Sequence, residues 1–394
     1  MTPSARLQAA IELVDAIALA AREGGAAADT LIRAYFKQRR YAGSADRRAV
    51  RDLVYRAIRR SGERPASGRA ALLGLADQDQ ALLDLFDGSP HGPAMREDGE
   101  SGAAAVAVPA WLLPCLDPLV NAAEVPSLLD RAPLDLRVNR LKGDRESAMA
   151  LLPDATPTLL SPLGLRLPEG FRVEDSEAWG SGLVEVQDEG SQLVALAAAV
   201  APGQNVVDLC AGAGGKTLAL AGEIGNRGRI IASDTDRGRL SRLAPRLARA
   251  GVTSVEQRLL NPRAELDTLT DLRGTADVVL VDAPCSGSGT WRRNPETRWR
   301  LDQQRLGRLV ELQAYLLDIA VELVRPGGTI TYAVCSLLAA EGREQALRFE
   351  ARRSSFVSED TAIEGGRSCG PGRLLTPGHD GTDGFFVARW QAPC

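Results

Sequence analysis

The sequence has 394 residues, of which 44% are apolar and 25% charged, and its formal net charge is −4. A chain of this length exceeds one compact core, so two or three domains are expected, and the composition excludes disordered and fibrous proteins. No apolar run approaches the roughly 18 residues of a membrane span. Arg6, Glu12 and Asp15 interrupt the N-terminal stretch at helical spacing, which favours an amphipathic helix over a signal peptide. A cytoplasmic protein without a membrane partner is expected.

Cysteine and histidine usage narrows the chemistry. The six cysteines include no Cys-x-x-Cys pair, so free thiols are expected, with no metal site and no disulfide framework. The chain has only two histidines, which leaves few candidates for a mechanism built on imidazole. Thiols and carboxylates are therefore the candidate catalytic groups.

Residues 1–125 are predicted to form an all-helical domain, because apolar positions recur with helical period through the first 60 residues. Ser44 is a predicted helix start, and Arg60, before a Ser-Gly pair, a predicted end. A Gly- and Pro-rich stretch at 87–108 predicts a mobile linker or long loop, and a further helix is expected from Ala110 to about Ala123.

Positive charge is concentrated in two places although the net charge is negative. Between Arg33 and Arg60 the sequence has ten Lys/Arg residues and only two acidic residues. A second basic cluster runs from Arg292 to Arg308. Solvated helix faces and a phosphate-binding surface both fit this pattern.

The rest of the chain changes from short strands to strand–helix alternation. Residues 126–182 predict a small α+β module, beginning with a strand within Arg131–Asn139. Residues 183–394 predict a Rossmann-like α/β domain with a parallel, doubly wound sheet that binds ligands at the carboxyl ends of its strands. The expected elements are strands Gln204–Leu209, Arg229–Ser233, Ala276–Val281 and Gly328–Val334, and helices Leu240–Ala250 and Leu301–Val324.

A glycine-rich turn, Asp208–Thr217, follows the first of these strands. A phosphate-binding P-loop would need glycine where Cys210 stands, and the dinucleotide fingerprint would need glycine at Thr217, so both fail on spacing. Asp234, at the tip of the next strand, is placed to bind a ribose diol. A glycine-rich turn with a ribose acid and no phosphate loop favours S-adenosylmethionine as cofactor; the alternative is a plain turn followed by an N-cap aspartate.

Two cysteines end neighbouring strands of the predicted sheet. Cys285 closes Asp282-Ala283-Pro284-Cys285, and Cys335 follows the last strand. A lone cysteine at a strand end is more often packing, but two flanking one crevice, with an aspartate, suit methyl transfer to the 5-carbon of a pyrimidine. That carbon becomes nucleophilic only after a thiolate adds to the neighbouring 6-carbon. Residue type alone does not rank the two thiols, nor does it choose between Arg292-Arg293 and the cofactor's sulfonium as the charge that activates one.

Five segments in order resemble the motifs of the RNA cytosine-5 methyltransferases of the Sun/Fmu (RsmB) and NOL/NSUN family, over nearly the whole chain. They are Gln187–Ser191, Asp208–Thr217, Asp282–Pro295, Thr331–Ser336 and Asp383–Phe386. The resemblance implies that Cys335 is the attacking thiol, Cys285 the helper in product release and Asp282 the group beside the pyrimidine ring. The opposite assignment, with Cys285 attacking, remains the alternative.

The resemblance also implies the ligand contacts. The expected cofactor-binding residues are Cys210, Ala211, Gly212, Ala213, Gly214, Gly215, Lys216, Asp234, Asn261 and Asp282. One departure concerns the adenine: the family's acid after the third strand is replaced by Leu260-Asn261, so Asn261 would accept the adenine amino hydrogen without charge assistance.

The N-terminal helices are similar to the NusB-like domain of the bacterial ribosomal RNA members. This similarity implies an enzyme that acts on small-subunit ribosomal RNA and contacts its phosphates with the basic surface between Arg33 and Arg60. A monomer is expected. The expected RNA-binding residues are Arg33, Lys37, Arg39, Arg40, Arg47, Arg48, Arg292 and Arg293. Two alternatives stay open: a transfer RNA cytosine-5 methyltransferase, and an RNA-binding assembly factor with weak or no catalysis.

Overall fold

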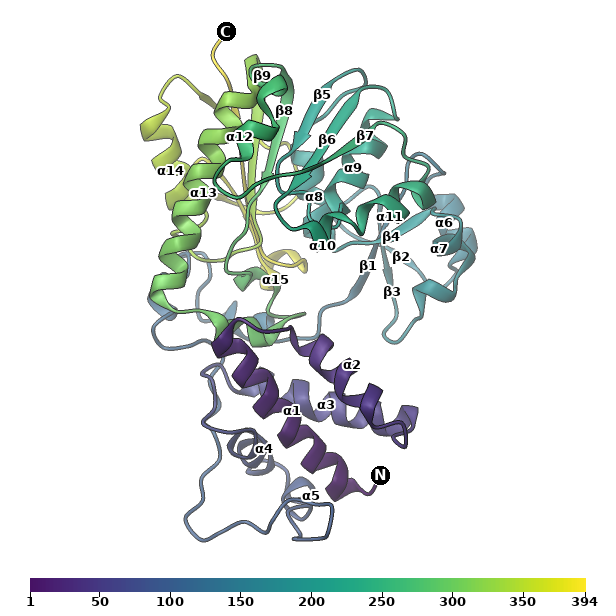
Figure 1. Ribbon diagram of the computed structural model, residues 1–394, viewed down its shortest axis with the longest axis vertical. Helices are drawn as coiled ribbons and strands as arrows, with labels where there is room; N and C mark the ends of the chain where they lie inside the picture. The colour runs from purple at the N-terminus through teal and green to yellow at the C-terminus, as the bar shows by residue number, and fades with distance from the viewer. The chain divides into compact units, whose positions relative to one another are not determined.

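A computed structural model describes residues 1–394 as two compact units of a mixed α/β protein (Figure 1). The helical unit comprises Met1–Leu116, Val125–Asp130 and Thr290–Gln303. The sheet unit comprises the remaining three stretches, Asp117–Glu124, Arg131–Gly289 and Gln304–Cys394. The predicted fold class, helices followed by a small α+β module and a Rossmann-like sheet, is confirmed. None of the helices combines the length and apolarity that a bilayer crossing requires.

The helical unit is built on three amphipathic helices whose apolar faces share one core. Side-chain capping fixes where the first helix starts, because Thr2 accepts a hydrogen bond from the amide of Ala5. The third helix begins at Ser44 and ends at Arg60, as predicted. The helices are α1 Pro3–Glu23, α2 Ala28–Gln38, α3 Ser44–Arg60, α4 Gly68–Ala76 and α5 Gln80–Leu83.

The stretch predicted as a linker is a long loop held against these helices. Arg69 donates to the carbonyls of Ala94 and Met95, both at 3.0 Å, and the amide of Gly62 donates to the carbonyl of Val106 at 2.6 Å. These bonds anchor the loop along much of its length.

The helix predicted from Ala110 to Ala123 is wrong. The structure forms only a short 3₁₀ turn there, η1 Leu113–Cys115. Pro114 and Pro118 explain the difference, since each lacks an amide donor and disfavours helical geometry in the residue before it.

The segment Thr290–Gln303 belongs to the helical unit, although the sequence places it within 183–394. Its 3₁₀ helix η6, Pro295–Arg300, packs against α1 and α3. Trp299 is 4% exposed in the helical core. The helical unit is therefore completed by a segment that lies far along the chain.

The α+β module is a four-stranded antiparallel sheet in the order β2-β3-β1-β4. Its last strand lies beyond the expected boundary at 182, because β4 pairs with β1, Leu136 opposite Val186. The elements are β1 Leu134–Val138, α6 Arg145–Leu151, β2 Thr156–Pro157, β3 Gly164–Leu167, α7 Glu177–Gly180 and β4 Val184–Val186.

The large sheet has the order β11-β12-β13-β9-β8-β5-β6-β7, with β10 paired to β13. Five neighbouring strands, β9, β8, β5, β6 and β7, run parallel to one another, and β13 is antiparallel to β9. All four predicted strands are present. The strands are β5 Asn205–Asp208, β6 Arg229–Asp234, β7 Val255–Leu259, β8 Ala276–Asp282, β9 Val324–Val334, β10 Val357–Glu359, β11 Arg367–Cys369, β12 Gly372–Leu375 and β13 Phe385–Gln391.

Helices follow most of these strands, and Figure 1 shows α13 beside β8 and β9. The ring of Phe349, in α14, packs against that of Trp390, in β13. The helix predicted over Leu240–Ala250 is interrupted after Leu240, because Pro245 cannot donate to the preceding turn. The helices are α8 Glu189–Ala197, α9 Gly215–Ile224, α10 Arg237–Leu240, α11 Leu243–Ala250, α12 Glu265–Thr268, α13 Gln303–Leu323, α14 Arg343–Arg352 and α15 Pro377–Asp380.

Candidate active site

The carboxyl ends of β5, β6, β8 and β9 bring the predicted residues of the sheet unit to one edge. Asp208 ends β5, Asp234 ends β6 and Asp282 ends β8. Parallel pairing places these ends side by side, with Asp282 opposite Ala333 of β9 in the strand register. This edge is where an open α/β sheet binds its ligand.

The glycine-rich turn between β5 and α9 depends on left-handed backbone. Gly212 and Gly214 have φ of 56° and 85°. A Cβ on Gly214 would lie 2.0 Å from Leu243, so only glycine fits between the turn and α11. The other residues of the turn, Cys210, Ala211, Ala213 and Gly215, continue the same backbone into α9. The turn thus leaves its backbone open to a ligand.

Asp234 is held by the backbone around it. One carboxylate oxygen accepts from the amide of Gly212 at 2.8 Å, and the other accepts from the amide of Asp236 at 2.7 Å. Each oxygen retains a free lone pair, which two ribose hydroxyls would use. Asn261 lies just after β7, and the backbone amide of its neighbour Leu260 donates to the carbonyl of Asp234.

Asp208 is fully buried and shares its site with other carboxylates. The hydroxyl of Thr217 donates to its Oδ2 at 2.6 Å, while Oδ1 is buried without a partner. The pKa of Asp208 is raised to about 7, mainly by burial and also by the charges of Asp282 and Asp234, which together outweigh the hydrogen bond from Thr217 and the charge of Lys216.

This raised pKa predicts a pH-dependent stability. Below about pH 4 Asp208 is protonated in both states; between pH 4 and 7 the folded chain keeps a proton that the unfolded chain releases, so the unfolding free energy falls as pH rises. Asp208→Asn removes this loss. Relative to the parent, its unfolding free energy should rise by up to roughly 4 kcal/mol between pH 4 and 8 in urea denaturation. Asp154→Asn, at an exposed carboxylate, is the control. The prediction would be contradicted if the difference in unfolding free energy from the parent did not change with pH for either variant.

The two predicted cysteines are in contact. Cys285 Sγ lies 3.3 Å from Cys335 Sγ, and both residues are partly exposed. The hydrogen bond to Cys335, followed by burial, raises the pKa of the Cys285 thiol well above its ordinary value. The two thiols are therefore electrostatically coupled, and either sulfur can be the donor in this contact.

Asp282 forms an ion pair that sequence analysis did not anticipate. Lys216 Nζ lies 2.6 Å from Asp282 Oδ2, and the ammonium also lies 5.3 Å from the centre of the Phe385 ring. Burial lowers the pKa of Lys216, but Asp282, and further away Cys335, outweigh burial, so its pKa is raised. A permanent positive charge thus stands near Asp282 and Cys335.

The first and last of the five motifs, Gln187–Ser191 and Asp383–Phe386, are joined to each other by hydrogen bonds. Asp188 caps α8 and also accepts from the amide of Asp383, at 3.1 and 3.2 Å. Gly384 donates to the carbonyl of Gly289 at 2.8 Å, and a Cβ on either glycine would clash with the other. The opening and closing motifs are thereby tied to each other and to the loop after Cys285.

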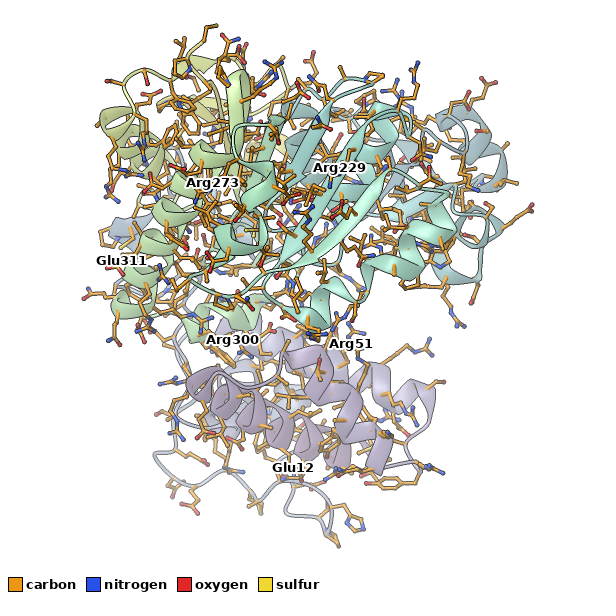
Figure 2. The ribbon with its side chains drawn as sticks, turned by 45° about the horizontal axis from the view of Figure 1, so that its top comes forward. Glu12, Arg51, Arg229, Arg273, Arg300 and Glu311 are labelled. Atoms are coloured by element: carbon orange, nitrogen blue, oxygen red, sulfur yellow. The ribbon has the colours of Figure 1, made fainter.

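The predicted RNA-binding residues all lie in the helical unit. Lys37, Arg40 and Arg48 are exposed and form no ion pair, and Arg47 bonds to the carbonyl of Ala42. The other predicted surface residues are more restrained: Arg33 bonds to the carbonyl of Asp29, and Arg39 pairs with Glu12, labelled in Figure 2, and stacks on Tyr35.

Arg292 and Arg293 lie in the segment Thr290–Gln303 of the helical unit. Arg292 is 6% exposed and Arg293 is half-buried. Their part in RNA binding stays a prediction. Within the sheet unit, Lys216 is a cation that lies near Cys335.

Comparison with known proteins agrees with the motifs. Residues 195–391 match the family described as 16S rRNA methyltransferase RsmB/F. The chain is 33% identical, over 71% of its own length, to a probable ribosomal RNA small subunit methyltransferase B of Synechocystis, and 34% identical, over 66%, to the ribosomal RNA small subunit methyltransferase B of Salmonella paratyphi B. It spans 66% and 59% of the lengths of these relatives.

Solved structures share the fold. The protein PH0851 superposes with a TM-score of 0.77 at 22% identity, covering 99% of both chains. A methyltransferase homologue from Pyrococcus horikoshii gives 0.61 at 25% identity, covering 70% of this chain and 92% of the other. With half of its length matched by the family and a third of its aligned residues identical to curated relatives, the chain belongs to the RsmB/F family of 16S rRNA methyltransferases.

Proposed function

We propose that the chain methylates the 5-carbon of a cytosine in ribosomal RNA, of the small subunit, through a covalent bond between Cys335 and the base. The observation that carries this proposal is the contact of Cys285 and Cys335, 3.3 Å apart, at the sheet edge that also holds Asp282. Two thiols and a carboxylate are the groups that this chemistry requires. Membership of a family of rRNA methyltransferases supports the substrate class.

The crevice suits S-adenosylmethionine, which supplies an electrophilic methyl group. Gly212 and Gly214 leave the backbone approachable, and Asp234 offers its carboxylate to a ribose diol. The buried, unpartnered Oδ1 of Asp208 is an acceptor that a cationic ligand would satisfy. Asn261 would contact the adenine through its amide, as a weaker partner than the carboxylate typical of the family.

Cys335 is the better candidate for the attacking thiolate. The pKa of the Cys285 thiol is raised well above its ordinary value, first by the hydrogen bond to Cys335, which disfavours Cys285 as the nucleophile. Lys216 places a positive charge near Cys335, and positive charge beside a cysteine is the setting that activates a thiol for attack. Cys335 then adds to the 6-carbon of the ring, which makes the 5-carbon nucleophilic.

The Lys216–Asp282 pair stabilises the charge that develops on the pyrimidine ring. Attack on the 6-carbon pushes negative charge toward ring nitrogen 3, and the pair shares its proton with that atom. After methylation a base removes the 5-proton, the electron pair of that C–H bond restores the 5,6 double bond, and the bond to Cys335 breaks so that its sulfur leaves as a thiolate. Cys285, 3.3 Å away, is placed to assist this release.

The helical unit supplies an RNA-binding surface. Lys37, Arg40 and Arg48 are exposed cations without acidic partners, the arrangement that phosphate binding requires. The proposal thus includes RNA as partner, a cytoplasmic location and a monomeric enzyme that uses no metal.

Bisulfite sequencing of total RNA from a strain lacking the gene tests the substrate. Loss of a single 5-methylcytosine from small-subunit rRNA is the expected result. Loss from a transfer RNA instead would establish the transfer RNA alternative. An unchanged methylcytosine map would contradict the proposal and favour an assembly factor.

Cys285→Ala is expected to trap the reaction after attack. Without the helper thiol, elimination of Cys335 slows, and a protein–RNA adduct accumulates that survives denaturing electrophoresis. The Cys285→Ala, Cys335→Ala double variant is the control and should form no adduct. An adduct in that double variant would contradict the assignment of Cys335.

A further inference from the structure

A buried glutamate links the two cysteine loops. Ser286 directly follows Cys285, and its amide donates to Glu341 Oε1 at 2.9 Å. Ser336 directly follows Cys335, and its hydroxyl donates to Glu341 Oε2 at 2.5 Å. One carboxylate therefore binds, with separate oxygens, the residue after each thiol.

The glutamate is fixed from several directions. Glu341 is 0% exposed, and Gln313 donates to its Oε1 at 3.0 Å while also donating to the carbonyl of Pro284, beside Cys285. The hydroxyl of Tyr332 donates to the backbone carbonyl of Glu341 at 2.6 Å. The carboxylate thus has three donors, which offset the cost of burying its charge.

Serine hydroxyls close the same network. Ser286 Oγ lies 3.2 Å from Ser336 Oγ, and Ser288 Oγ lies 3.1 Å from each of them. Ser288 also accepts from the amide of Leu337 at 2.8 Å. The network contains no cation, so the geometry of the two loops depends on the carboxylate.

We propose that Glu341 is a positioning residue that sets the spacing of Cys285 and Cys335. The inference rests on the proposed function, in which these thiols act in turn on one base. A glutamine keeps the length of the side chain but offers only one oxygen to three donors, and its amide faces the Ser336 hydroxyl. An aspartate is one methylene too short to reach both loops.

The spacing can be measured without the reaction. Phenylarsine oxide bridges two close thiols: both S–H bonds break, two arsenic–sulfur bonds form, and the oxygen leaves as water. Glu341→Gln is expected to weaken this bridging about tenfold or more, because the thiols lose their fixed spacing. Glu344→Gln is the matched control, since Glu344 is an exposed neighbour paired only with Arg348. Cys285→Ala marks complete loss of bridging.

Turnover gives the second readout. Glu341→Gln should lower kcat about 100-fold while leaving the Kd for S-adenosylmethionine unchanged, a split that general destabilisation does not produce. If this variant does not fold, Ser336→Ala is tested in its place. It removes the hydrogen bond from Ser336 to Glu341 and leaves the other donors to Glu341 unchanged. Bridging or kcat at the parent level in the folded variant would overturn the inference. Bridging remains measurable on a parent protein that methylates no RNA, so failure of the proposed function is a separate result.

Discussion

Cys335→Ala is expected to abolish methyl transfer to RNA, with a loss on the order of 10⁴-fold or more in kcat/KM. The 5-carbon of cytosine does not react with a sulfonium methyl group until a thiolate has added to the 6-carbon. Cys285, although 3.3 Å away, follows β8 and not β9, so its thiol does not occupy the position from which Cys335 is proposed to reach the 6-carbon. The measurement is transfer of a labelled methyl group from S-adenosylmethionine to small-subunit rRNA.

Two controls separate the role of Cys335 from general effects of losing a thiol. Cys394→Ala removes an exposed cysteine and should leave transfer unchanged. Calorimetric binding of S-adenosylmethionine by Cys335→Ala should match the parent, because the predicted cofactor contacts lie at the ends of β5, β6, β7 and β8 and just after them, and none lies on β9. Retained transfer by Cys335→Ala, together with its loss in Cys285→Ala, would reverse the roles of the two thiols.

The crevice was predictable because its residues occupy strand ends. A parallel sheet brings the ends of its strands together, so Asp208, Asp234, Cys285 and Cys335 were placed near one another from apolar runs alone. The ion pair of Lys216 with Asp282 was not predictable in this way. The two residues are 66 positions apart, and the direction of a lysine side chain depends on packing that periodicity does not encode.

Glu341 was missed for a similar reason. In sequence it is one acid in an alanine-rich stretch, a pattern typical of a solvated helix start. Its burial follows from the chain's return between the two cysteine loops, where Ser286, Gln313 and Ser336 converge. A glutamate six residues after the proposed catalytic cysteine was the available signal.

The predicted domain boundaries follow chain continuity, whereas the contacts group Thr290–Gln303 with the helical unit. The segment follows the Pro-Cys motif directly, so it was assigned to the Rossmann-like domain. Its side chains instead complete the helical unit: Glu296 accepts from the amide of Ala28 at 3.2 Å, and Arg300, labelled in Figure 2, donates to the carbonyls of Gly25 and Ala26. These contacts satisfy backbone groups at the start of α2 and after the end of α1, which those helices leave unpaired.

Trp299→Ala is expected to destabilise the helical unit by about 3–5 kcal/mol. The indole is 4% exposed in the core that α1 and α3 share, and its Nε1 donates to the carbonyl of Ser61 at 2.7 Å. Truncation removes this apolar contact, leaves a cavity and strips a buried carbonyl of its partner. Because the two units need not unfold together, the measurement is native-state hydrogen exchange of amides in α1 and α3 of the full chain.

Matched variants divide that loss into its parts. Trp299→Phe keeps most of the apolar contact and loses the bond to Ser61, so about 1–2 kcal/mol is expected. Arg300→Ala changes the neighbouring half-buried residue, which lies outside the core, and should cost less than either. Equal hydrogen-exchange protection of α1 and α3 in Trp299→Ala and in the parent would contradict the prediction. It would show that Thr290–Gln303 does not stabilise the core of the helical unit. Protection lost together in both helices would show that the segment after the catalytic loop is a structural part of the helical unit.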